Sequence, residues 1–566
     1  MIKELEKVKK PIIYICLSII LASISYGIFD KNKWLTIISV SLFFIYIIIE
    51  VNWCFAIVIL GFFIMQIGVN YLYYNSINNK CVNDEIRIIE NKDYYILGKY
   101  KGKLVYLNNL NTTVVKGDKL YINGEFNKDE DLEKGIVGSI NIKKYNKCNE
   151  DLLCKLNNIP VQIFNKLEEN IGKRKAALVV SVSLGYREFL DSEDEEDMRD
   201  LGIIHAISVS GLHVALVFGV CKRFFSDKTS LVISFIYVLI TGAEFSSLRS
   251  ILMIVILVTA KNSNKNYYSI VSLLLSATIN ILIQPYAIFN LGFILSYVST
   301  IGILLFSKRI RNKLRNIPHC ISSTIAISLA AQIFTIPIII VIFGEVSITF
   351  IIGNMLIVPL LNIIIYLGNL LIIFSFSDSI FDFISFILLK LIKVIDIVMN
   401  KLYTISNGGL IINEKIATVY IICLISFYFI YKGYKKFYML PIISLIFMFI
   451  SIYSPVPKID YIDKGVILIS YKGERNIIST QNNVNMKELK KRYFAQEGFR
   501  LIKKVVINNE VILNSKNKDF IIRINKKEYY LKLNKYSKIK QCCDVISFVD
   551  EEARGFYIIS DRIIIY

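Results

Sequence analysis

The sequence predicts a polytopic α-helical membrane protein with an inserted small β-barrel of OB-like type and a small mixed α/β or β-rich C-terminal domain. Apolar residues make up 54% of the 566-residue chain, and they come in runs long enough to cross a bilayer. Two polar regions interrupt or follow these runs, at 78–147 and 456–566. We therefore divide the chain into a membrane segment at 1–77, the barrel insert at 78–147, a helical linker at 148–199, a membrane core at 200–455 and a tail at 456–566.

The N-terminal segment contains three apolar runs, at 11–29, 34–49 and 55–74. Backbone groups find no water inside the hydrocarbon, so these runs must be helices. They are not a cleaved signal peptide, because further runs follow. The leading segment MIKELEKVKK is rich in lysine and is expected on the cytoplasmic side. Three crossings then place the insert in the exterior compartment.

The insert reads as a series of short strands. The expected strands are 86–89, 94–97, 104–107, 112–115, 120–126 and 136–142, with turn signals at Gly117-Asp118 and Asn123-Gly124. Five or six such strands suit a small closed barrel. Three cysteines flank the insert, Cys81, Cys148 and Cys154, and a disulfide among them is left open.

Aromatic and basic residues alternate within the insert. Aromatic faces stack on bases and lysines attract phosphates, so this mixture suits single-stranded nucleic acid. The candidate residues are Tyr94, Tyr95, Lys99, Lys101, Tyr106, Lys119 and Tyr121. The alternative is that the tyrosines form the barrel core and the lysines are solvated, since strands favour tyrosine in any case.

The membrane core follows an acidic stretch at 191–200. The expected spans are 200–221, 229–243, 245–260, 268–283, 286–306, 320–343, 347–376, 381–400, 415–431 and 437–454. The span at 347–376 is either one tilted helix or a broken pair. This count places the basic loops at 222–228, 261–265, 308–315 and 432–436 inside and the tail outside.

Two of the only three histidines lie in the segment 202–214, GIIHAISVSGLHV. Polar residues in an apolar segment are costly in lipid, so they are expected to face a protein interior or an aqueous path. Hydrogen bonding between helices by buried histidines is the structural alternative. The eight-residue spacing of His205 and His213 does not match a metal site, and we expect neither metal nor cofactor.

A second polar stretch runs from Leu239 to Met253. Thr241-Gly242 is expected to interrupt the helix, and a helix restarting near Ser246 would carry Arg249 one turn later. Free N–H groups and an arginine fork both suit a phosphate. A structural ion pair between Glu244 and Arg249 is the competing interpretation.

These stretches closely resemble the ComEC family of polytopic DNA-uptake channels. The resemblance rests on four ordered motifs between residues 202 and 359: G-x-x-H with S-G-L-H-V, T-G-x-x-x-S-x-x-R, G-F-x-L-S, and Q-x-x-x-x-P followed by N-x-x-x-x-P. The residues that match and form the expected translocation core are Gly202, His205, Ser210, Gly211, Leu212, His213, Gly242, Ser246, Arg249, Gly292, Phe293, Ser296, Gln332, Pro337, Asn354 and Pro359.

The resemblance implies a channel for single-stranded DNA in the bacterial cytoplasmic membrane. It also implies an exterior membrane-anchored DNA receptor and a cytosolic ATPase or helicase, because the chain contains no P-loop motif. The net charge of +20 suits a polyanion or an anionic lipid face.

The tail departs from the family. Many members carry a metallo-β-lactamase-like domain there, but no histidine follows His319 in this chain. Such a domain needs a histidine cluster to hold its metals. We expect a degenerate, metal-free remnant without enzyme activity.

Two alternatives remain from the sequence. One is a transporter of a small molecule or a lipid-linked precursor, which inverted hydropathy repeats would favour. The other is a membrane-embedded serine hydrolase that uses Ser210 and His213, although no third orienting group or oxyanion hole can be identified.

Overall fold

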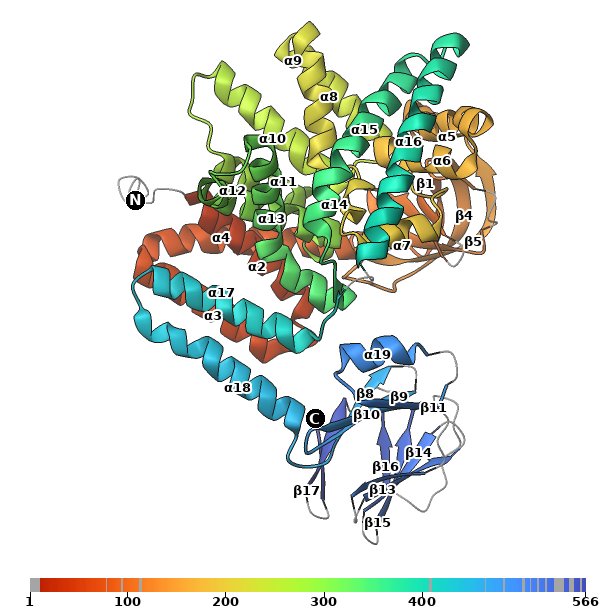
Figure 1. The fold of residues 1–566 in the computed structure, drawn as a ribbon. Helices are drawn as coiled ribbons and strands as arrows, with labels where there is room; N and C mark the ends of the chain where they lie inside the picture. The colour runs from red at the N-terminus through yellow and green to blue at the C-terminus, as the bar shows by residue number, and fades with distance from the viewer. Residues whose placement is uncertain are drawn as a thin grey trace. The chain divides into compact units, whose positions relative to one another are not determined.

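The structure is a computed structural model (Figure 1). It describes residues 11–566 except 78, 93–94, 111–113, 407–409, 464, 482–483, 501–503, 509–510, 517–518, 525–526, 534–543, 549–553 and 560–561. The described residues fall into two compact units. The first comprises residues up to 334 together with 348–408, and the second comprises 335–347 together with the residues from 409 onward.

The first unit begins with three apolar helices, α2 (Pro11–Ile28), α3 (Lys33–Glu50) and α4 (Trp53–Asn75). Asn32 and Asn52 cap α3 and α4, and each side chain accepts a hydrogen bond from a backbone N–H of the first turn. Helix α2 packs on α4 through a buried polar contact, in which Gln66 Nε2 donates to Ser23 Oγ at 3.1 Å. In lipid such a contact joins helices more specifically than apolar packing does.

The insert forms a closed five-stranded barrel, drawn in orange in Figure 1. Its strands are β1 (Cys81–Lys92), β2 (Tyr95–Tyr100), β3 (Lys103–Asn108), β4 (Lys119–Asn127) and β5 (Ile136–Lys147). The order around the barrel is β1-β2-β3-β5-β4, and only the β3–β5 pair is parallel. The expected strand at 112–115 is not formed at Val114 and Val115, and its first two residues lie outside the described residues.

Alternation along the strands places aliphatic side chains inside the barrel. Along β4, Leu120, Ile122 and Phe126 are buried, while Tyr121 and Glu125 between them are exposed. The barrel core is thus mainly aliphatic. Cys81, Cys148 and Cys154 are free thiols.

Three helices follow the barrel: α5 (Leu152–Ile171), α6 (Lys173–Leu184) and α7 (Ser192–Asp200). Every side chain from Ala176 to Leu184 of α6 is buried. Helix α6 therefore lies inside the largest apolar cluster, together with residues of α5, α15 and α16. Arg174 at its start contacts Asp194 at 2.6 Å and Asp396 at 3.2 Å, which ties α7 and α16 to α6.

The membrane core is a set of helices joined by short turns. They are η1 (Ile204–Ala206), α8 (Gly211–Phe224), α9 (Asp227–Ile240), α10 (Phe245–Asn262), α11 (Ser269–Ile283), η2 (Pro285–Phe289), α12 (Leu291–Lys313), α13 (His319–Phe343), α14 (Phe350–Leu356), α15 (Val358–Ile373) and α16 (Asp378–Ser406).

These helices differ from the expected spans in two places, and at 347–376 the structure selects one of the two predicted alternatives. The stretch expected as a span from 200 begins its helix only at Gly211, after a turn and a 3₁₀ segment. The stretch at 347–376 is a broken pair, α14 and α15, bent by 44°. Helix α16 is amphipathic, because Asp382, Lys390, Lys393 and Asp396 interrupt its apolar residues.

Eight helices among the described residues are long and apolar enough to cross a membrane, or nine if the bent pair counts as one span. They are α2, α3, α4, α10, α12, α13, α17 and the segment at Lys435–Tyr453. The chain therefore has the helices of a polytopic membrane protein.

The second unit contains α17 (Glu414–Tyr431), η3 (Lys435–Tyr438) and α18 (Met439–Tyr453), followed by two sheets. The two-residue strands β6 (Glu345–Val346) and β7 (Leu410–Ile411) pair with each other. The first sheet contains β8 (Lys458–Asp463), β9 (Val466–Tyr471), β10 (Glu474–Ser479), β11 (Glu497–Arg500), β17 (Gly555–Ile559) and β18 (Arg562–Ile565). Helix α19 (Met486–Arg492) packs beside β10 and β11.

The second sheet contains β12 (Lys504–Asn508), β13 (Val511–Lys516), β14 (Asp519–Ile524), β15 (Lys527–Lys532) and β16 (Asp544–Ser547). Its inner face packs on the first sheet, and Leu513 and Phe520 share one buried cluster with Ile459 and Phe556. The tail is thus a β-rich sandwich with one short helix.

Candidate functional site

The first motif begins where α7 ends. Gly202 has a φ of +72°, and Ile203 N donates to Met198 O at 2.8 Å. This is the left-handed helix end that glycine favours. His205 follows in the 3₁₀ turn η1 and is exposed. The turn delivers the chain to Ser210, which caps α8.

His213 is buried in a fixed orientation one turn into α8. Its Nδ1 accepts from Ser210 N at 3.0 Å, and its Nε2 lies 2.8 Å from Val182 O. A carbonyl oxygen can only accept and a backbone amide can only donate, so the ring is the neutral tautomer with its proton on Nε2. In this tautomer the Ser210 hydroxyl donates to Nδ1 at 2.9 Å, and Ser210 Oγ accepts a hydrogen bond from Leu212 N at 3.3 Å. These are the contacts of a capping box, and the partner of Nε2 is a carbonyl rather than the carboxylate of a triad.

The second motif forms the break between α9 and α10. Gly242 and Ala243 both have positive φ values, +84° and +52°, and Ala243 N donates to Val238 O at 2.9 Å. The chain then restarts as α10 at Phe245. Ser246 Oγ donates to Val209 O, which fixes the start of α10 beside the segment that leads into α8.

Arg249 lies on α10 and reaches α12. Its Nη1 donates to Ser296 O at 2.9 Å, and its guanidinium lies 5.9 Å from the centre of the Tyr297 ring. Its Nε is buried and has no hydrogen-bond partner among the described residues, and the same holds for Ser296 Oγ. Buried unpaired donors are costly, so this arrangement leaves hydrogen-bonding capacity for a ligand.

Gly211, the first residue of α8, packs directly against this arginine. A Cβ at this position would lie 2.7 Å from Arg249 Nη2 and closer still to Ser250 Oγ. Only glycine leaves room for the guanidinium here. The first, second and third motifs therefore meet at one place, built from Gly211, Arg249 and Ser296.

The third motif supplies the aromatic wall of this place. Asn290 caps α12 by accepting from Phe293 N at 3.2 Å, with Gly292 between them. The buried ring of Phe293 lies 4.4 Å from that of Tyr297, centre to centre. Tyr297 is positioned by α11, because Asn280 Nδ2 donates to its hydroxyl at 2.9 Å.

Glu244 does not pair with Arg249. Its carboxylate lies 3.9 Å from Arg187 Nη2, so the ion pair weighed from the sequence forms with a different arginine. A small pocket lies nearby, lined in part by Lys116 of the barrel, Gly185 and Gly242. A Cβ on Gly242 would lie 3.4 Å from Lys116 Nζ. A basic side chain of the barrel thus reaches the break before α10.

The fourth motif is spread over α13, α14 and α15. Asn354 Nδ2 donates to Ser328 Oγ at 3.1 Å, and Ser328 lies on α13 one turn before Gln332. Asn354 Oδ1 is buried and has no hydrogen-bond partner among the described residues. Pro337 lies inside α13, and Pro359 lies in the first turn of α15. Asn354 and Pro359 thus lie in the two halves of the pair that is bent by 44°.

Two comparisons with known proteins give a match to this chain. Residues 182–435 match the family model described as "Competence protein". The chain is also 28% identical over 191 residues to ComE operon protein 3 of Bacillus subtilis (strain 168). Both matches support the resemblance to the ComEC family of competence proteins. The match covers 32% of this chain and 24% of the length of that relative, and no solved structure gives a significant match.

The barrel carries the other predicted residues on its outer face. Tyr95 and Tyr106 are half-buried neighbours on β2 and β3, with ring centres 5.9 Å apart. Tyr121 is exposed on β4. Lys101 lies in the β2–β3 turn, 5.2 Å from the Tyr100 ring centre. Tyr94 lies outside the described residues.

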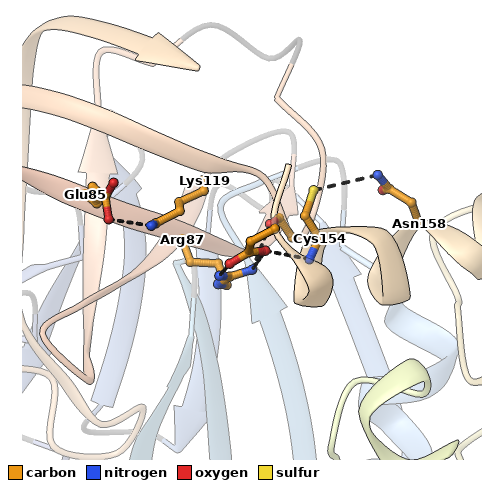
Figure 2. A network of polar contacts seen from close by, with 7 residues as sticks. Glu85, Arg87, Lys119, Cys154 and Asn158 are labelled. Carbon is orange, nitrogen blue, oxygen red and sulfur yellow. Dashed lines mark hydrogen bonds and ion pairs between the residues drawn. The ribbon is translucent and has the colours of Figure 1, made fainter. Parts of the chain in front are cut away.

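Three basic residues form a row across the barrel. The strand register places Lys99 of β2 opposite Arg87 of β1, and Arg87 opposite Lys119 of β4. Figure 2 shows how two of them are held: Lys119 pairs with Glu85, and Arg87 lies beside the start of α5 near Cys154. Arg87 pairs with Asp151, the cap of α5, and this pairing lowers the pKa of that carboxyl to about 2. Lys99 is exposed.

Among the described residues, no group of three or more His, Cys, Asp or Glu side chains is placed to hold a metal ion. Three further residues of this candidate site were not predicted from the sequence: Tyr297, Asn280 and Ser276. Ser276 Oγ lies 3.1 Å from the Tyr297 hydroxyl, to which Asn280 also donates. The sequence contains a signal for Asn280 and Ser276. They are polar residues four apart in an apolar helix, which places both on one face.

Proposed function

We propose that this chain passes single-stranded DNA across the bacterial cytoplasmic membrane during natural transformation. The observation that carries the proposal is the meeting of three separate sequence motifs at Arg249. There Nη1 is bonded to Ser296 O at 2.9 Å, while Nε and Ser296 Oγ are buried without partners among the described residues.

This site suits a phosphate of a DNA backbone. An arginine fork donates two parallel hydrogen bonds to phosphate oxygens, and such charge-assisted bonds are strong. Transported DNA has arbitrary sequence, so contacts to its backbone suffice and base-specific contacts are not needed. The Tyr297 and Phe293 rings beside the guanidinium supply a face on which a base can stack.

The barrel suits the reception of the strand. Its order, β1-β2-β3-β5-β4 with a parallel β3–β5 pair, supports an OB-like reading. OB folds bind nucleic acid on the face of strands 2 and 3, where Tyr95, Tyr106 and Lys99 lie in this chain. Lys116, next to Gly242, would bring the phosphates from the barrel towards the break before α10.

The proposal places the N-terminus in the cytoplasm and both the barrel and the β-rich tail outside. An exterior membrane-anchored receptor delivers the strand, and a cytosolic ATPase or helicase pulls it. The tail then acts as a metal-free remnant of a metallo-β-lactamase-like domain, and the chain itself does not cut DNA. This assignment follows from the absence of any histidine after His319.

The test is transformation of a competent strain whose corresponding chain has been deleted. Arg249→Ala should abolish transformation while the protein remains in the membrane at its normal level. Arg249→Lys keeps the charge but loses the fork, so we expect partial activity. The control is Arg199→Ala, which removes an arginine paired with Glu195 on the surface of α7 at 3.3 Å and should leave transformation unchanged. Normal transformation with Arg249→Ala would refute the phosphate site.

A further inference from the structure

The second unit contains a buried polar row that DNA transport does not use. In the register of the first sheet, Lys458 of β8 lies opposite Ser470 of β9, and Ser470 lies opposite Arg475 of β10. Residues directly opposite each other on antiparallel strands project from the same face. The neighbouring residues Ile459 and Ile469 belong to the core between the two sheets, so the row lies on the other face of the sheet.

Two members of the row are buried with unused hydrogen-bonding groups. Arg475 is 3% exposed and Ser470 is 1% exposed. Nε and Nη1 of Arg475 and Oγ of Ser470 have no hydrogen-bond partner among the described residues. A buried guanidinium without a full set of partners destabilises a fold, so this site is incomplete without an acceptor.

The row is also short of negative charge. Asp460 is the acidic neighbour, and it lies 2.9 Å from Lys458 Nζ and accepts from the Tyr566 hydroxyl. The charges of Arg475 and Lys458 also act on the ammonium of Lys415, in the first turn of α17. Burial lowers the pKa of Arg475, and Asp460 offsets part of that effect. Among the described residues, Asp460 is the carboxylate that acts on all three cations, Lys458, Lys415 and Arg475.

The row lies at the ends of two apolar helices. Lys415 Nζ donates to Ser451 Oγ in the last turn of α18. The β9–β10 hairpin is bonded to the end of the same helix, where Gly473 N donates to Tyr453 O at 2.6 Å. Both helices are long and apolar enough to span a membrane, so their ends mark the depth of the lipid headgroups. Phe447 and Phe449 of α18 are exposed, as expected of a surface that faces acyl chains.

We propose that Arg475, Ser470, Lys458 and Lys415 bind the phosphate of an anionic phospholipid, whose acyl chains lie along α18. A phosphate oxygen accepts hydrogen bonds and supplies the missing negative charge. A lipid fits better than DNA, because the donors are enclosed beside an apolar helix, whereas proteins bind single-stranded DNA along open grooves. The lipid would fasten the β-rich tail to the membrane surface. This inference does not depend on DNA transport.

The experiment uses the purified full chain in a neutral detergent, with thermal unfolding followed as phosphatidylglycerol replaces a neutral phospholipid. We expect phosphatidylglycerol to raise the unfolding temperature of the wild-type protein. Arg475→Gln should bind this lipid roughly 10- to 100-fold more weakly, as expected for the loss of hydrogen bonds from a charged group. Ser470→Ala should show a smaller loss. Lys472→Gln, an exposed lysine in the same hairpin, is the matched control and should behave as the wild type.

A second measurement keeps the test valid if a variant is simply unstable. Without anionic lipid, Arg475→Gln should unfold at a higher temperature than the wild type, because it removes a buried charge that lacks partners. In phosphatidylglycerol, the wild type should unfold at a higher temperature than Arg475→Gln. Equal responses of the wild type and Arg475→Gln to the lipid would overturn the proposal. Full stabilisation of the wild type by inorganic phosphate alone, or by a short single-stranded oligonucleotide alone, would overturn the assignment to a lipid.

Discussion

Replacement of Gly211 by alanine tests the geometry of the Arg249 site without removing any functional group. The added Cβ would lie 2.7 Å from Arg249 Nη2, whereas ordinary contact begins at 3.4 Å, so the guanidinium must move by about 0.7 Å. If the fork moves away as a unit, the bond from Nη1 to Ser296 O lengthens from 2.9 Å to beyond hydrogen-bonding distance. A bond from a charged group contributes about 1.5–3 kcal/mol, which corresponds to roughly a 10- to 150-fold loss of affinity.

The assay is the transformation frequency of a strain that carries Gly211→Ala as its only copy, with the membrane level of the protein measured in parallel. We expect a loss of about 10- to 100-fold at an unchanged protein level. The matched control is Gly219→Ala on the same helix, where a Cβ meets nothing within 4 Å. It should be neutral or slightly stabilising, since alanine favours a helix over glycine by roughly 0.5–1 kcal/mol. Equal transformation by the two variants would refute the steric role given to Gly211.

Three further predictions concern stability and are measured by thermal unfolding of the purified chain. Tyr297→Phe removes the hydroxyl that accepts from Asn280 and should cost about 1–3 kcal/mol, since a buried amide loses its partner; no change would contradict the role given to Asn280. Gly302→Ala brings a Cβ against the carbonyl of Ala330, a backbone group that cannot move aside, and should cost about 1–3 kcal/mol, whereas Gly61→Ala, with nothing nearby, should not. Asp151→Asn keeps a cap on α5 but loses the charge that pairs with Arg87. The pKa of Asp151 is depressed to about 2, so its stabilisation is present above about pH 4 and disappears as the pH falls through 2. The wild type should therefore exceed the variant in stability at pH 5 and match it near pH 2, and a constant difference would contradict the ion pair.

The parts of the fold that sequence predicts well are those set by local patterns. The apolar runs at the N-terminus became α2, α3 and α4, and alternation together with turn residues predicted a small barrel. The expected strand at 120–126 forms as β4, and the Asn123-Gly124 signal within it marks a bulge where the register with β5 shifts. Where two local signals resemble each other, the prediction differed from the structure. Helix α16 is apolar enough to suggest a span, but its charged residues make it an amphipathic helix on the core.

The residues of the candidate site could be taken from sequence motifs, but their contacts could not. The motifs pointed to Gly211, Arg249 and Ser296, yet no local rule shows that residues 85 positions apart share one site. The partner of Glu244 could not be predicted from the sequence either, because Arg187 approaches it through tertiary packing rather than along a helix face. The buried row in the tail depends on the pairing of three strands, which is visible only in the sheet register.

The most direct measurement of the central claim is the entry of end-labelled DNA into a nuclease-protected cytosolic pool. It compares a competent strain deleted for its own chain with the same strain restored by this chain or by its Arg249→Ala variant. If the chain passes DNA through a site at Arg249, protected single-stranded label should appear with the wild-type chain and not with the variant, with both proteins present in the membrane. Equal entry with the two chains, or no entry with the wild-type chain in the membrane, would contradict it.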